Sequence, residues 1–137
     1  MAHTIRRVDY FKATVKDQPG EAYKLLAVLS DLGVNLVAIN LIPVGPACTQ
    51  LTLYPEDSHQ LRTAASGARL ALEGPQRALL LRGEDVLGAL VEVHARLATA
   101  KVNVFASSGV SDGQGHYCYI LHVRPEEFER AAQTLEV

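Results

Sequence analysis

A short segment of the sequence, Asp17-Gln18-Pro19-Gly20-Glu21, has the residue types needed to hold a small charged molecule. Gly20 has no side chain where a helical pattern begins, so the first backbone amides of that helix stay open to a ligand. These amides and the positive end of the helix dipole favour a carboxylate. The Asp17 carboxylate suits an α-ammonium group, and Gln18 can donate or accept a hydrogen bond. Alternatively, Pro19 and Gly20 only form the turn and Asp17 caps the helix.

A related segment follows later in the chain, with Asp85 and Gly88 at the same spacing. Val86-Leu87 stand between them and make this turn more apolar, which is compatible with a purely structural role. Asn35 and Asn103 each follow the predicted helix and offer amide donors and acceptors at the start of the next strand. These residues are candidates for ligand binding, with the first turn as the better site.

A third group, His116, Cys118 and His122, lies on one face of a predicted strand. Imidazoles and a thiolate at alternate positions can bind a metal ion or act in catalysis. However, His122 stands far along the strand, zinc usually needs a fourth ligand, and no comparable set occurs in the first half of the chain. We therefore interpret the group as a polar strand face, and predict no metal, no cofactor and no catalytic residue. Tyr117 and Tyr119, on the opposite face of the same strand, are expected in the core.

The two candidate turns belong to an internal repeat. Shifting the sequence by 68 residues aligns positions 17–53 with 85–121 without a gap and gives nine identities, where chance gives about two or three. The apolar pattern repeats as well. The sequence therefore predicts two copies of one unit, at residues 1–74 and 75–137.

Each copy shows the same changes of apolar period. In the first, we expect a strand at 10–16, a helix from the turn to Gly33, strands at 36–42 and around 49–53, a helix at 59–68 capped by Asp57 or Ser58, and a strand at 69–72. In the second, a closing helix starts near Pro125, and the chain leaves little room for a final strand. That strand is very short or missing, or something else completes the sheet. The fold class is α+β, with two ferredoxin-like βαββαβ sandwiches in tandem, each an antiparallel sheet with helices on one face.

The run from Asp17 to Asn40, with its Pro-Gly turn, leucine-rich helix and Gly33-Val34-Asn35, resembles the ACT domain, a small-ligand regulatory module. The resemblance covers the chain from about Tyr10 and implies an amino-acid sensor without catalytic activity. It also implies that the ligand lies between two units, against the first turn and both asparagines. The expected ligand-binding set is Asp17, Gln18, Pro19, Gly20, Glu21, Asn35, Asn103, Asp85 and Gly88. Any regulated enzyme or transcription factor would be a separate protein.

Composition limits the remaining possibilities. The 137 residues carry 13 basic and 15 acidic side chains, and no basic cluster exceeds Arg6-Arg7, so we expect no binding to nucleic acid. The sequence has neither a membrane-spanning apolar run nor a signal peptide, and its two cysteines fit buried thiols in the cytoplasm. Apolar residues expected on the outer sheet face (Leu36, Ala38, Ile42, Leu80 and Ile120) indicate a homodimer. The rival functions are a protein-interaction module that has lost its ligand and, third, a small enzyme or metal-binding protein using His116, Cys118 and His122.

Overall fold

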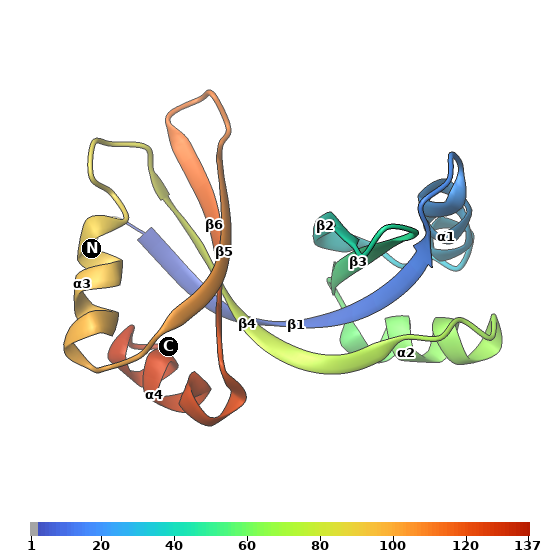
Figure 1. The fold of residues 1–137 in the computed structure, drawn as a ribbon. Helices are drawn as coiled ribbons and strands as arrows, with labels where there is room; N and C mark the ends of the chain where they lie inside the picture. Colours follow the sequence, from blue (N-terminus) through green and yellow to red (C-terminus); the bar gives the residue numbers. More distant parts are fainter. Residues whose placement is uncertain (1–2) are drawn as a thin grey trace. The chain divides into compact units, whose positions relative to one another are not determined.

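The computed structural model describes residues 3–137, which form an α+β fold of six β-strands and four α-helices (Figure 1). The strands follow one another in the hydrogen-bonded order β2-β3-β1-β4-β6-β5. The pairs β1–β3, β2–β3, β4–β6 and β5–β6 are antiparallel. The chain divides into two compact units, and the long strands β1 and β4 contribute to both.

One unit comprises Asp9–Gln76. It contains most of β1 (His3–Lys16), then α1 (Glu21–Asp31), β2 (Leu36–Val44), β3 (Cys48–Pro55), α2 (Ser58–Gly67) and the start of β4 (Glu73–Glu84). The strand predicted at 10–16 is confirmed as part of β1, and its residues Phe11 and Ala13 are buried against leucines of β3, α1 and α2. Leu36, which we expected on the outer face, packs against this same core.

The other unit comprises residues 3–8 and Arg77–Val137. It contains the start of β1, most of β4, α3 (Val91–Thr99), β5 (Val104–Ser111), β6 (His116–Val123), the short 3-10 helix η1 (Pro125–Glu127) and α4 (Phe128–Thr134). In this part of the described chain no strand follows α4. The start of β1 lies beside β4 in the strand order, where a fourth strand would stand, and Ile5 packs against the unit's core. The ranges 1–74 and 75–137 for the two repeated units stay a prediction.

The strand expected at 69–72 is wrong. Arg69 adopts a left-handed conformation with φ 56°, and the Leu70 N–H donates to the Ala65 carbonyl at 2.8 Å, so this segment closes the end of α2. Leu70 and Leu72 are both half-buried against the core, which produced the alternating pattern of a strand. The next strand begins at Glu73 instead and continues through Pro75 to Glu84 as β4.

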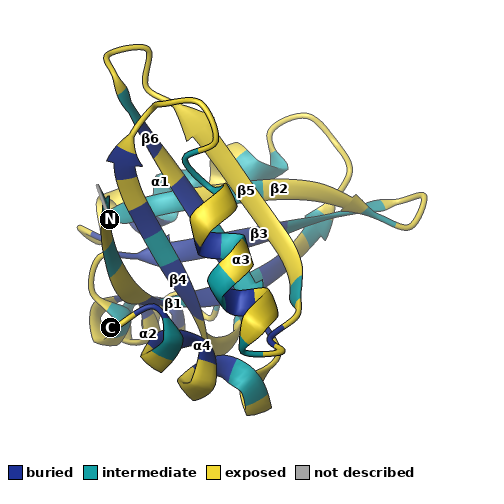
Figure 2. Cartoon of the chain, turned by 90° about the vertical axis from the view of Figure 1, so that its left-hand side faces the viewer, coloured by how far each residue is buried: buried dark blue, intermediate teal, exposed yellow. Residues whose placement is uncertain are grey.

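Burial differs sharply between the strands of the second unit. β6 alternates between buried and more exposed residues, whereas every residue of β5 after Val104 is exposed (Figure 2). Cys118 on β6 is also exposed and Cys48 is half-buried, so the prediction of buried thiols is wrong. None of the helices within residues 3–137 is long and apolar enough to cross a membrane.

Candidate functional site

The turn before α1 is held by backbone hydrogen bonds. The Asp17 N–H donates to the Ala47 carbonyl in the β2–β3 hairpin at 2.9 Å, and the Gln18 N–H donates to the Lys16 carbonyl at 2.9 Å. Gly20 then begins α1 with φ 88°, a conformation that favours glycine. No side chain caps this helix, so Asp17 does not have the capping role considered as the alternative. The Glu21 N–H donates to the Gln18 carbonyl at 3.3 Å, and no side chain caps the amides that follow it in the first helical turn.

The turn before α3 repeats this arrangement 68 residues later. The Asp85 N–H donates to the Gly115 carbonyl at 2.9 Å, and the Val86 N–H donates to the Glu84 carbonyl at 3.0 Å. Gly88 has φ 74°, and α3 also begins without a side-chain cap. The internal repeat of the sequence is thus a repeat of backbone geometry at both candidate turns.

The predicted asparagines do not meet the turn of their own unit. Asn35 lies beyond the C-terminal end of α1, so the 11 residues of this helix separate it from Gly20 by roughly 16 Å. Its side-chain amide donates to the Glu56 carboxylate at 2.8 Å. Asn103 follows α3 in the same way, at the far end from Gly88. Neither unit by itself assembles the complete predicted set.

A cavity of about 510 Å³ opens at the second turn. Its walls come from the turn and the start of α3, from the end of β5 and from the start of β6. They include the predicted residues Asp85 and Gly88. The other lining residues are Val86, Ala89, Leu90, Val91, Gly109, Val110, Ser111, Tyr117, Cys118 and Tyr119.

The polar groups of this cavity are few and placed at different depths. At the exposed rim, the Ser111 hydroxyl donates to the Asp85 carboxylate at 2.7 Å. Tyr117 is 7% exposed, and its hydroxyl has no hydrogen-bond partner among residues 3–137. Burial raises the pKa of Tyr117, so its hydroxyl stays protonated at neutral pH. No lysine, arginine or histidine is among the lining residues. The site therefore offers backbone amides, one carboxylate and neutral hydroxyls on apolar walls.

The second unit makes this cavity through differences from the first. Gly109 stands where the first copy has Leu41, and Tyr119 stands where it has Leu51. A Cβ on Gly109 would lie 2.9 Å from Cδ1 of Tyr119, so glycine leaves room for the aromatic ring. The Tyr119 hydroxyl lies 2.8 Å from Nε2 of His94, which replaces Leu26.

Tyr117 and Tyr119 were expected in the core, and their burial confirms this. The sequence did not reveal that they also line a cavity together with Gly109 and Ser111. The sequence signal that could have indicated this cavity was the glycine at position 109, where the first half of the chain has Leu41.

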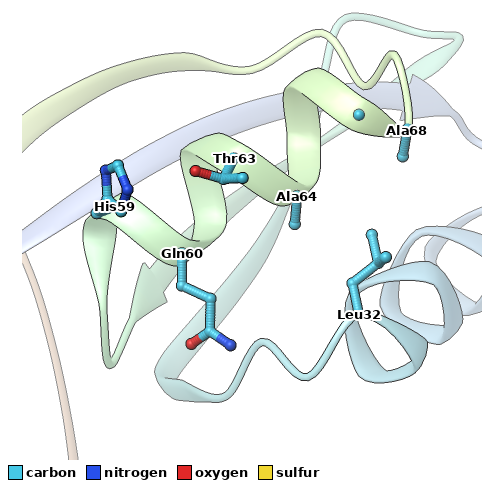
Figure 3. A pocket seen from close by; sticks show the side chains of 7 residues that line it. Leu32, His59, Gln60, Thr63, Ala64 and Ala68 are labelled. Carbon is cyan, nitrogen blue, oxygen red and sulfur yellow. The ribbon is translucent and has the colours of Figure 1, made fainter.

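A second cavity, of about 580 Å³, lies in the first unit between the end of α1 and one face of α2 (Figure 3). It contains none of the predicted site residues. The Gln60 side-chain amide at its wall donates to the Gly33 carbonyl at 2.9 Å, which ties α2 to the end of α1. The other lining residues are Leu32, His59, Thr63, Ala64, Gly67 and Ala68.

The strand residues of the metal hypothesis do not form a cluster. His116 lies 3.9 Å from the Asp112 carboxylate, whereas the His122 ring packs edge-on against Phe105 with their centroids 6.2 Å apart. Within residues 3–137, no three histidine, cysteine or acidic side chains gather in a way that could hold a metal ion.

No protein-family model matches the sequence, and no curated protein matches it either. Several solved structures share its fold. A protein from Bacteroides thetaiotaomicron superposes with a TM-score of 0.80 at 13% identity, over 99% of this chain and 90% of that one. The ligand-free regulatory subunit of aspartate kinase from Thermus thermophilus gives 0.66 at 16% identity, over 99% and 95%. E. coli aspartokinase III in complex with aspartate and ADP gives 0.55 at 16% identity, over 98% of this chain and 32% of that one.

Proposed function

We propose that this chain is an ACT-type regulatory protein that binds an amino acid or a similar small carboxylate and has no catalytic activity of its own. The observation that carries this proposal is the cavity of about 510 Å³ beside Asp85 and Gly88. The second predicted turn, the uncapped start of α3 and the Asp85 carboxylate surround this cavity, which is large enough for a small molecule. The fold shared with the regulatory subunit of aspartate kinase supports the regulatory role.

The ligand's charged groups match the polar groups at the cavity rim. Its carboxylate accepts hydrogen bonds from amides at the start of α3, where the helix dipole is positive, other than those of Ala89 and Val91, which donate to the Val86 and Gly88 carbonyls. Its α-ammonium lies against the Asp85 carboxylate, which Ser111 holds in place from β5. Its side chain packs on apolar residues of the turn and of β5, among them Val86, Leu90 and Val110.

The first turn, Asp17-Gln18-Pro19-Gly20-Glu21, stays in the proposal as a second site with the same backbone geometry. Under this proposal the chain is a tandem of two ferredoxin-like sandwiches. Asn35 and Asn103 lie far from the turns of their own units, and their part in ligand binding stays a prediction from the resemblance.

We also propose that the protein is a homodimer. Ile39 and Leu41 on β2 are 41% and 47% exposed, and Phe105 and Val110 on β5 are 52% and 68% exposed. Exposed apolar residues on the outer strand of a sheet favour pairing with another chain.

A ligand that contacts two units then stabilises the paired arrangement, and this is how binding is reported to a separate regulated protein. Light scattering at micromolar concentration tests this part, and a monomer with and without ligand contradicts it.

The rival function is a protein-interaction module without a small ligand, and exposed apolar side chains at the second turn favour it. Leu87 is fully exposed and Val86 is 57% exposed. Thermal unfolding in the presence of each of the twenty amino acids separates the two functions. A ligand at 100 times its dissociation constant adds about 2.7 kcal/mol of stability, which raises the midpoint by several degrees. We expect one or a few amino acids to do this, whereas no shift with any of them favours the interaction module.

A further inference from the structure

The buried hydroxyl of Tyr117 has no evident structural purpose. The side chain is 7% exposed and belongs to the core of its unit, yet no described residue hydrogen-bonds its oxygen. A buried hydroxyl without a partner destabilises the folded state, and phenylalanine would fill the same space without this cost. The neighbouring Tyr119, by contrast, lies 2.8 Å from Nε2 of His94. Tyr117 therefore differs from a tyrosine whose hydroxyl is used within the fold.

Tyr117 is one of the residues that line the candidate site. Tyr117 begins the buried face of β6, pairs with Gly83 on β4 and Ser111 on β5, and lines the cavity. Gly83 contributes no side chain on one side, and Ser111 directs its hydroxyl to Asp85 on the other. The partner that the Tyr117 hydroxyl lacks can therefore come from a molecule in the cavity.

The charges around the cavity restrict what this molecule can be. Asp85 is the one carboxylate among the lining residues, and no lysine, arginine or histidine lines the walls to pair with a second anionic group. An acidic ligand side chain would be desolvated beside a carboxylate and without a cation. A purely aliphatic side chain would leave the Tyr117 hydroxyl unpaired.

Building on the proposed function, we infer that Tyr117 is a specificity-determining residue, and that the second-turn cavity selects an amino acid whose uncharged side chain carries a hydroxyl or an amide. That group completes the hydrogen bonding of the Tyr117 hydroxyl. A site built to hydrogen-bond a ligand group discriminates strongly against an analogue of the same shape that lacks it. Thr49 occupies the equivalent position in the first copy, so the preference belongs to the second unit.

Calorimetric titration with isosteric pairs tests this inference on the full chain. The probes are L-threonine against L-valine and L-asparagine against L-leucine, with L-aspartate as the charged analogue of asparagine. We expect the polar member of at least one pair to bind at least tenfold more tightly than its apolar isostere, and aspartate to bind more weakly than asparagine. Tyr117→Phe removes this preference and leaves the affinity for the apolar member unchanged. Its unfolding midpoint stays equal to that of the wild type or rises, because an unpaired hydroxyl is lost.

Tyr10→Phe is the matched control, because it removes the hydroxyl of a buried tyrosine that does not line the cavity and that donates to the Gln76 side-chain oxygen at 2.6 Å. It should lower stability and keep the preference. The inference is overturned if the apolar isosteres bind equally well to the wild type, or if Tyr117→Phe keeps the preference. It is also overturned if Tyr117→Phe fails to fold, since the hydroxyl would then have a structural partner. If no amino acid binds to the wild type, the proposed function fails together with it.

Discussion

At the scale of single residues, the cavity depends on the absence of a side chain at Gly109. An alanine there would place its Cβ 2.9 Å from Cδ1 of Tyr119, inside contact distance of a buried ring. We expect Gly109→Ala to lower the free energy of unfolding by about 1–3 kcal/mol, because the ring must shift against a packed core. Urea denaturation measures this change. The same substitution should weaken ligand binding by displacing Tyr119 into the cavity.

Gly67→Ala provides the matched control for this prediction. Gly67 is the last residue of α2, and a Cβ at this position would have no other atom within 4 Å. Alanine there should leave stability unchanged or raise it by about 0.5 kcal/mol, because it restricts the unfolded chain. Equal losses for the two variants would contradict a steric role of Gly109.

At the scale of elements, the starts of the helices differ. Helices α1 and α3 follow the two candidate turns, whereas α2 follows β3. The Asp57 carboxylate accepts a hydrogen bond from the Gln60 N–H at 3.1 Å and caps α2, which decides between the two predicted caps, Asp57 and Ser58, whereas α1 and α3 have no side-chain cap. We expect Asp57→Ala to cost about 1 kcal/mol of stability. Asp17→Ala should change stability by less than about 0.5 kcal/mol, because its carboxylate caps no helix. Thermal unfolding compares the two, and a loss for Asp17→Ala as large as that for Asp57→Ala would show that Asp17 has a structural role.

An ion-pair cluster ties the start of β1 to α4 within the unit of residues 3–8 and 77–137. The Glu129 carboxylate accepts hydrogen bonds from Arg77 at 2.8 Å and from Arg7 at 2.9 Å. These two guanidinium groups hold the pKa of Glu129 below its usual value of 4.5. A lowered folded-state pKa stabilises the fold above the usual value, and this contribution is lost as the pH falls through the folded-state pKa.

Glu129→Gln should therefore destabilise the protein at pH 7 and make progressively less difference as the pH is lowered towards 3, because wild-type Glu129 becomes protonated as the pH falls through its lowered pKa. Denaturation curves at several pH values check this dependence. Glu126→Gln, on the exposed first turn of η1, is the control and should have no effect at either pH. A loss for Glu129→Gln that is the same at pH 7 and pH 3 would contradict the ion-pair account.

The sequence predicted the elements better where local chemistry decides them. The turns at Gly20 and Gly88 and the capping by Asp57 follow from the conformational needs of a few neighbouring residues. The strand expected at 69–72 failed because a helix exit with two half-buried leucines shows the same alternation. The role of residues 3–8 beside β4 could not be predicted, since it depends on a pairing between segments about 70 residues apart.

At the scale of the whole molecule, the two candidate turns share one backbone plan but differ in the side chains around them. The hydrogen bonds that hold the turns agree within 0.1 Å between Asp17 and Asp85 and between Gln18 and Val86. The repeat was visible in the sequence, but the cavity was not, because it arises from side chains on three separate elements. The sequence favoured the first turn as the ligand site, with its Pro19-Gly20 pair. The cavity that Tyr117 lines lies at the second turn instead.

The amide proton–nitrogen NMR spectrum of the full chain, recorded with and without a pool of the twenty amino acids, tests the central claim most directly. We expect shifts at the amides of Gly88 and Leu90, with smaller shifts around Gly20, because ligand carboxylates bind at the start of α3 and α1. Gly88→Asp should abolish the shifts at the second turn, because its carboxylate repels the ligand's. A spectrum that the pool leaves unchanged at both turns, or changes only elsewhere, would contradict the account.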